Sequence, residues 1–243
     1  MNPTASASPT RVDEIADGIF RISTPVPPSV VPGGFTFNQY LVRDDSPLLF
    51  HTGPRMLFGA VSEAIGRVIP LESLRYVSFS HVEADECGSL NQFLAAAPHA
   101  QPLCGQVAAM VSIGDLADRP PRVLADMERL SLGAHEVQWI DTPHLPHGWE
   151  CGFLVETTTR TLLCGDLFTQ FGEDHPALTE DDILEPSEAA RLSTMDYYAH
   201  APDTGRLLER LAATAPTTLA CMHGPAWRGD GAAMLRRLAA RVG

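Results

Sequence analysis

Three side chains that can bind a metal ion alternate along one short run, His81, Glu83 and Asp85. Imidazole nitrogens and carboxylate oxygens are donors that transition metals use in proteins. The run directly follows RYVSFS at residues 75–80, which is typical of a buried strand. Side chains that alternate along an extended loop can converge on one side of it. The competing interpretation of this triplet, taken alone, is a solvated acidic loop.

Three further donors, His147, Asp166 and His223, lie where a predicted strand meets a loop. Asp166 follows the apolar run TLLCG, and His223 follows TTLACM. Open α/β sheets bind ligands at the carboxyl ends of their strands, so donors placed there are expected to converge. Six donors at four strand ends are typical of a metal site, and we predict that all six are metal ligands.

The elements that must position these donors fall into two similar halves, each with strands followed by helices. The runs of β-branched and apolar residues predict strands at 19–23, 35–43, 48–51, 75–80, 101–103, 136–141, 152–156, 161–163 and 217–222. Apolar residues at helical spacing predict helices at 56–68, 89–97, 106–113, 194–213 and 232–242. Residues 173–188 have no clear period and are expected to form a lid or a surface loop.

The composition bounds the class of protein. We expect residues 1–11, rich in Ser, Thr, Ala and Pro, to be a disordered arm before a single domain at 12–243. A formal net charge of −13 argues against nucleic acid as a partner. Neither a signal peptide nor an apolar run long enough to cross a membrane is present. The five cysteines are widely spread, which predicts free thiols and a cytoplasmic location.

On these motifs the sequence resembles the metallo-β-lactamase superfamily. Within it the resemblance is to the di-iron domain of flavodiiron proteins and to stand-alone oxygen-binding di-iron proteins. It rests on HVEAD at 81–85, His147 followed by Trp149, LLCGDLFTQFG around Asp166, and HGPAWRG at 223–229. It extends over roughly residues 18–232, and 18 residues separate His147 from Asp166, close to the family's interval.

The resemblance implies an α/β (α+β) fold, the four-layer αββα metallo-β-lactamase sandwich, with the metals at the edges of the sheets. It also implies a division of the ligands. One metal would be bound by His81, Glu83 and His147, the other by Asp85 and His223. Asp166 would bridge the two.

The departures from the zinc-hydrolase motif H-x-H-x-D-H concern the identity of the metal. Glu83 stands where those proteins have their second histidine, and Glu86 where they have the last. Carboxylates add negative charge next to the metals, which stabilises higher oxidation states. We therefore expect two iron ions, with zinc or a mixed iron–zinc pair as the alternative.

Glu86 and Tyr197 are the candidate catalytic residues. Glu86 stands where many relatives have a sixth ligand, so it is expected to bind the second metal, contact it through water, or face solvent. Tyr197 and Tyr198 are adjacent on a predicted helix and cannot both face the site. One of them is expected to line the pocket, and the other to pack or face solvent.

Two histidines near the predicted ligands have alternative interpretations. His144 lies three residues before His147 in PHLPHG, and local sequence allows either as the ligand. The spacing to Asp166 and the following GW favour His147. His51 stands where relatives usually have an aspartate, and we expect it to be a hydrogen-bonded or buried residue rather than a ligand.

The resemblance favours a non-haem di-iron protein that binds, and with electrons from outside reduces, dioxygen, nitric oxide or peroxide. Flavodiiron proteins carry their electron donor in a flavodoxin-like domain, which we do not find in this sequence, so a separate electron-donor protein is the expected partner. A homodimer is also expected. The alternative is a metal-dependent hydrolase of an ester, lactone or thioester that uses a bridging hydroxide. A third possibility is a gas sensor without turnover.

Overall fold

The structure is a computed structural model of the chain, and it describes residues 10–243. Most of the arm predicted at 1–11 lies outside the described residues. The side chain of Thr10 is buried, and the first strand, β1, begins at Arg11. The last two residues of the predicted arm are therefore part of the fold.

The first half of the chain forms a seven-stranded sheet in the order β1-β2-β3-β4-β5-β6-β7. The first four strands pair antiparallel, and β4 to β7 pair parallel. The strands are β1 (Arg11–Ala16), β2 (Ile19–Val26), β3 (Phe35–Val42), β4 (Leu48–Phe50), β5 (Tyr76–Ser78), β6 (Gln101–Gly105) and β7 (Arg122–Leu124).

The second half forms another seven-stranded sheet, in the order β12-β14-β13-β11-β10-β9-β8. Its central pair, β11 and β13, is parallel, so these two strands end at the same edge of the sheet. The strands are β8 (Arg129–Ser131), β9 (Glu136–Asp141), β10 (Gly152–Glu156), β11 (Thr161–Leu163), β12 (Leu178–Thr179), β13 (Thr218–Ala220) and β14 (Ala226–Arg228).

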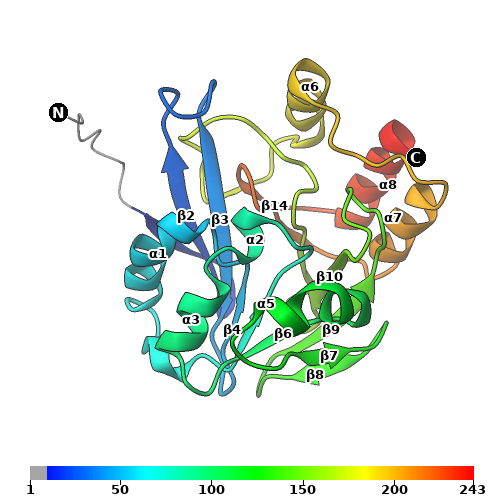
Figure 1. Cartoon of the computed structure of the whole chain (residues 1–243). Coiled ribbons are helices and arrows are strands. Elements are labelled where there is room, and N and C mark those ends of the chain that lie inside the picture. Colours follow the sequence, from blue (N-terminus) through cyan, green and yellow to red (C-terminus); the bar gives the residue numbers. More distant parts are fainter. Residues whose placement is uncertain (1–9) are drawn as a thin grey trace.

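Helices cover the outer face of each sheet, with α1 and α3 on one side of the molecule and α7 and α8 on the other (Figure 1). The α-helices are α1 (Phe58–Ile65), α2 (Ala84–Cys87), α3 (Leu90–Ala96), α4 (Gln106–Ala108), α5 (Gly114–Leu116), α6 (Leu184–Thr194), α7 (Thr204–Ala212) and α8 (Gly231–Val242). The remaining helical segments are η1 (Arg55–Leu57), η2 (Leu71–Ser73) and the π-helical η3 (Ala109–Ile113).

Three hydrophobic clusters define the layers. One joins the first sheet to its helices through residues such as Phe93, and another joins the second sheet to its helices through residues such as Leu208. The third lies between the sheets, where Phe50 and Trp139 are both buried. Two sheets that bury both faces require helices outside and a shared core inside. The predicted αββα sandwich is confirmed.

The helix predicted over residues 194–213 is wrong in its first half. Helix α6 ends at Thr194 and α7 begins at Thr204, and the segment between them, 195–203, is irregular. Pro202 lacks a backbone N–H and disfavours helical geometry at the residue before it, which explains why one helix does not run through. Part of the region predicted as a lid or loop is instead α6.

Each predicted ligand segment leaves the end of a strand. His81 follows β5, while Asp166 and His223 follow the parallel neighbours β11 and β13. His147 lies in the connection between β9 and β10. The five cysteines are free, as predicted, and no helix among residues 10–243 is long and apolar enough to cross a membrane.

Candidate metal centre

The run from His81 to Asp85 changes from loop to helix within five residues. His81 is buried, and Glu83 is extended, with φ −133° and ψ 160°, at the residue before helix α2. Asp85 lies within the first turn of that helix. The prediction of an extended loop is therefore correct for His81 and Glu83 and wrong for Asp85, which reaches the site from a helical turn.

Four predicted ligands lie together on one side of the site. Single donor atoms of His81, Glu83, His147 and Asp166 all lie within 4.8 Å of one another. Nε2 of His147 is 3.1 Å from Oε1 of Glu83, and Nε2 of His81 is 3.5 Å from Oε2 of the same carboxylate. Oδ2 of Asp166 is 3.7 Å from both imidazole nitrogens.

The other two predicted ligands face the opposite oxygen of the same aspartate. Nε2 of His223 is 3.3 Å from Oδ1 of Asp166 and 3.5 Å from Oδ2 of Asp85. Asp166 thus lies between two groups of donors, with one carboxylate oxygen toward each. This is the arrangement of a carboxylate that bridges two ions.

Hydrogen bonds at Nδ1 leave the Nε2 atoms of all three histidines directed into the site. His147 Nδ1 donates to the carbonyl oxygen of Tyr197 at 2.9 Å, and His223 Nδ1 donates to that of Thr36 at 2.7 Å. A carbonyl oxygen can only accept, so these contacts fix the tautomer with an unprotonated Nε2 in the neutral ring. Nε2 of His81 is buried without a hydrogen-bond partner among the described residues, as expected for a metal ligand.

Glu86 lies behind His81 rather than in the site. Its side chain is fully buried, and Oε2 accepts hydrogen bonds from the backbone N–H groups of Ser80 at 2.8 Å and His81 at 2.7 Å. Oε1 accepts from the Ser80 hydroxyl and lies 3.1 Å from Nδ1 of His81. Direct contact of Glu86 with a metal or a substrate does not agree with this position. Its carboxylate orients the His81 ring.

The two histidines with alternative interpretations lie outside the site. His51 is fully buried with Nε2 3.5 Å from Oε1 of Glu86, so it contacts the residue that supports His81 and not the ligands. Burial lowers the pKa of His51 and favours its neutral form. His144 is exposed, and its side chain does not take part in the cluster. The donor at the site is His147.

The loop that carries His147 packs directly on the loop that carries His81. Oε1 of Glu150 accepts the backbone N–H of Val82 at 2.7 Å. A Cβ atom on Gly148 would lie only 2.6 Å from Cβ of His81, so only glycine allows this close approach. These contacts bring donors from two distant parts of the sequence into one cluster.

His223 is supported by a buried polar network from the first sheet. The carbonyl oxygen of Gly224 accepts hydrogen bonds from Asn38 at 2.8 Å and from Arg21 at 2.9 Å, and Tyr40 donates to the carbonyl of Cys221 at 2.6 Å. Buried polar groups held in this way fix the turn after β13. The His223 ring therefore projects from one sheet while the other holds its backbone.

The charges of the metal-free cluster are strongly coupled. Burial alone would lower the pKa of His223, but hydrogen bonds to Asp166 and Asp85 outweigh it and raise the pKa to about 10. Burial also acts to lower the pKa of His81, but the negative charge of the Glu86 carboxylate outweighs it, so the pKa of His81 is raised as well. The hydrogen bond from His147 holds the pKa of Glu83 below its usual range. Without metal, protons on the imidazoles balance the carboxylates.

A cavity of about 330 Å³ opens above the cluster. It is lined by five of the six predicted ligands, all except His81, together with Phe35, Thr169, Met195 and Tyr197. Phe35 stacks on the His223 ring with centroids 4.2 Å apart. The sequence did not reveal Phe35, Thr169 or Met195. An aromatic residue in a strand is usually core, Thr169 lies in a loop, and Met195 fell within a predicted helix.

Tyr197 and Tyr198 divide as expected, one at the cavity and one in the core. Tyr197 lines the cavity, while Tyr198 is buried in the cluster under α7 and α8, and the two rings stack 4.7 Å apart. Burial raises the pKa of Tyr197 to about 12, so its hydroxyl stays protonated. Arg191 holds this segment, because it pairs with both Glu188 and Asp196.

Comparison with known proteins agrees with the fold. The family model "ODP family beta lactamase" matches residues 35–224, and the chain belongs to this family. The rubredoxin-oxygen oxidoreductase of Megalodesulfovibrio gigas is 29% identical over 209 residues, which are 82% of this chain and 50% of that protein. An anaerobic nitric oxide reductase flavorubredoxin of Salmonella typhi is 25% identical over 81% of this chain and 42% of its own.

Solved structures share the fold. The rubredoxin oxygen:oxidoreductase of Desulfovibrio gigas has a TM-score of 0.81 at 24% identity, over 95% of this chain and 62% of that one. A metal-soaked Flv1 flavodiiron core from Synechocystis has a TM-score of 0.78 at 23% identity, over 97% and 61%. The predicted resemblance to flavodiiron proteins is confirmed. The chain spans half or less of the length of the two relatives compared by sequence.

Proposed function

We propose that the cluster holds two iron ions and that the protein binds, and with an external electron donor reduces, a small molecule such as dioxygen or nitric oxide. His81, Glu83 and His147 bind one ion, and Asp85 and His223 bind the other. Asp166 bridges them. The position of Asp166 carries the proposal, since each of its oxygens faces a separate group of donors.

The donor set suits iron. Three imidazoles and three carboxylates surround the two positions, and each carboxylate contributes a full negative charge next to the ions. Such a mixed histidine–carboxylate set favours the higher oxidation states that redox chemistry requires. A related solved structure is a flavodiiron core, which supports the choice of iron. Two iron ions would supply reversible electron transfer to a bound molecule.

The residues of the chain itself prepare the site for a small ligand. The backbone carbonyls behind His147 and His223, and the carboxylate behind His81, hold the three rings in one orientation. The cavity has room for a small molecule between Phe35, Met195 and Tyr197. Tyr197 lines the cavity, and its hydroxyl stays protonated because burial raises its pKa to about 12.

Electrons must come from outside this cluster, because full reduction of dioxygen to water takes four electrons and two ferrous ions supply two. Relatives named for rubredoxin or flavoproteins support a protein donor. We propose a separate electron-donor protein as the partner.

The test is to count metals and to follow the optical spectrum. The protein is purified from iron-supplied cells, its metals are measured by mass spectrometry, and spectra are recorded before and after air meets the reduced form. We expect about two iron ions per chain and an absorption change that depends on oxygen. His144→Ala serves as a control, because His144 is an exposed histidine outside the cluster, and this variant should behave as the wild type.

Zinc alone, with no oxygen-dependent absorption even after the protein is reconstituted with iron, would overturn the proposal. Release of acid from an ester, lactone or thioester by the zinc-loaded protein would then establish the hydrolase alternative.

A further inference from the structure

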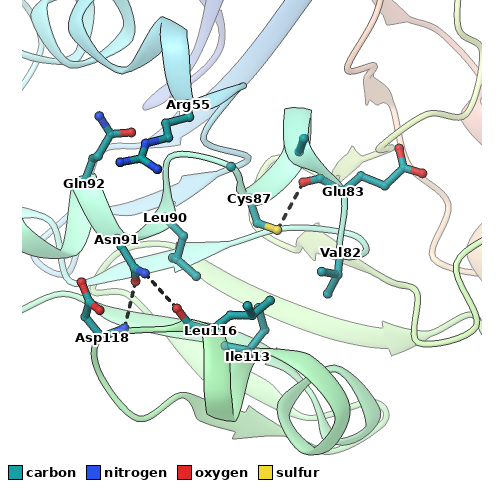
Figure 2. Close-up of a pocket in the computed structure, with 12 residues that line it drawn as sticks. Arg55, Val82, Glu83, Cys87, Leu90, Asn91, Gln92, Ile113, Leu116 and Asp118 are labelled. Atoms are coloured by element: carbon teal, nitrogen blue, oxygen red, sulfur yellow. Dashed lines mark hydrogen bonds between the residues drawn. The ribbon is translucent and has the colours of Figure 1, made fainter.

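A second cavity, of about 530 Å³, lies on the other side of the loop that carries Glu83. It is bounded by residues 82–92, by Arg55, and by the end of the segment formed by α4, η3 and α5. The two cavities share only Glu83, whose carboxylate in Figure 2 is directed away from this second cavity. Its volume is in the range of small-molecule sites.

The walls of this cavity are held in place by hydrogen bonds. Nδ2 of Asn91 donates to the carbonyl of Leu116 at 2.8 Å, and its Oδ1 accepts the backbone N–H of Asp118 at 2.8 Å. These bonds tie the segment after α5 to helix α3, as the dashed lines in Figure 2 show. The cavity is therefore a formed feature of the fold, and the Asn91 side chain stabilises its wall with these two hydrogen bonds.

Two polar side chains on one side of the cavity, Arg55 and Gln92, have polar atoms without partners in the protein. Arg55 is exposed, and its guanidinium takes part in no ion pair and no side-chain hydrogen bond among residues 10–243. Oε1 of Gln92 is buried and has no hydrogen-bond partner among the same residues. An amide oxygen and its NH₂ group can exchange places by a turn about the last side-chain bond, and the NH₂ group can then donate a hydrogen bond to an acceptor on a ligand.

The opposite side is mainly apolar, with the Asp118 side chain beside Leu116 in Figure 2. Figure 2 shows Ile113 and Leu116 across the cavity from Arg55 and Gln92, with Leu90 between them. Leu116 is 56% exposed, so a ligand would remove apolar surface from water there.

The backbone of this wall is itself unusual. Residues Ala109–Ile113 form a π-helical turn, which places Ile113 at the cavity. Single π-helical turns are rare and occur mostly at functional sites, because their weaker hydrogen bonding is retained only where the altered side-chain direction is useful.

We propose that this cavity binds a small organic carboxylate with an apolar body. The carboxylate pairs with the guanidinium of Arg55, the matching planar donor, and accepts a hydrogen bond from the Gln92 amide. The body packs on Leu90, Ile113 and Leu116. A neutral molecule of the same shape would leave Arg55 unpaired, and an inorganic anion would leave the apolar wall in water.

The probe for the test is 4-(trifluoromethyl)benzoate, with 4-(trifluoromethyl)benzyl alcohol as its neutral counterpart. Binding to the full-length protein is measured by fluorine NMR titration. We expect the benzoate to bind about tenfold more tightly than the alcohol, because only the benzoate can pair with the Arg55 guanidinium.

Three variants locate the site. Arg55→Gln should weaken benzoate binding about tenfold and leave the alcohol unchanged. Leu116→Trp should block both compounds by filling the cavity. Arg75→Gln is the matched control, because Arg75 is another exposed arginine without a side-chain partner among the described residues, and it does not line the cavity.

The proposal is overturned if benzoate and alcohol bind equally, if neither binds, or if Arg55→Gln and Arg75→Gln have the same effect. Metal content is measured on every sample. Because Arg55 and Leu116 touch none of the proposed metal ligands, a protein without iron can still bind the benzoate, and the two proposals can fail separately.

Discussion

Replacing Glu86 by glutamine tests whether a buried carboxylate behind His81 prepares that imidazole for metal binding. The carboxylate accepts the backbone N–H groups of Ser80 and His81 on one oxygen and faces Nδ1 of His81 with the other. In Glu86→Gln the amide oxygen can keep the two backbone bonds. The NH₂ group must then take the place of the oxygen that faces Nδ1.

The magnitude follows from the change of tautomer. Next to an NH₂ donor, Nδ1 of His81 is favoured as an acceptor, which moves the ring proton to Nε2, the atom that should bind metal. Binding must reverse this preference and lose the charge-assisted contact, which costs about 1.5–3 kcal/mol. We therefore expect the affinity for metal to fall about 10- to 100-fold.

A matched control is available elsewhere in the fold. Glu156 is also fully buried, accepts the backbone N–H groups of Thr158 at 2.9 Å and Thr159 at 2.7 Å, and lies 3.1 Å from Nδ1 of His135. It has no contact with the cluster. Glu156→Gln should lower stability toward urea by an amount similar to that of Glu86→Gln, without changing the affinity for metal.

The assay is a zinc titration of metal-free protein against a competing chromophoric chelator, because zinc uses the same donors and does not react with oxygen. Urea unfolding of the metal-free variants gives their stability. Equal affinities in the wild type and Glu86→Gln would refute the tautomer argument. Equal losses of affinity in both variants would show general destabilisation instead.

The remaining predictions concern the bridge and the protons of the metal-free cluster. Asp166→Asn should lower zinc affinity more than about 100-fold, because both ions lose a charged ligand. His144→Ala should leave the zinc affinity unchanged. Equal losses in the two variants would show that the wrong bridge or the wrong histidine was chosen. The pKa of His223 is raised from 6.5 to about 10, so the stability from its proton is complete below about pH 6.5 and is lost as pH rises through about 10. Metal-free protein should therefore become easier to unfold in urea between pH 7 and 10, and zinc binding at pH 7 should release protons into weakly buffered solution; a flat profile without proton release contradicts the assignment.

The sequence predicted nine of the fourteen strands, and it missed β1, β7, β8, β12 and β14. It was sufficient to predict which donors follow strand ends and lie together. The parallel strands β11 and β13 end side by side, so residues that directly follow them, Asp166 and His223, necessarily lie at one edge. The same reasoning applies to His81 after β5. Strand ends can be recognised from short apolar runs, and a polar residue soon after such a run must lie near the edge of the sheet where the strand ends.

The direction of Glu86 could not be predicted, because it depends on where helix α2 begins. Successive residues of a helix are rotated by about 100°, so Asp85 and Glu86 cannot both face the cavity. The helix begins at Ala84, which turns Asp85 toward His223 and Glu86 toward the backbone of Ser80. A start one residue earlier or later would change this assignment, and the sequence does not determine helix ends that closely.

The supports behind the histidines make the two proposed metal positions unequal. His81 is backed by a carboxylate, whereas His147 and His223 are backed by neutral backbone carbonyls. The position bound by His81, His147 and Glu83 therefore has the more electron-donating ligands. Glu86→Gln acts on this position alone, so a protein that binds two ions should lose affinity for one of them. The zinc titration of the variant should then separate into a tight step and a weak step, whereas a single weakened step would mean that both ions depend on His81.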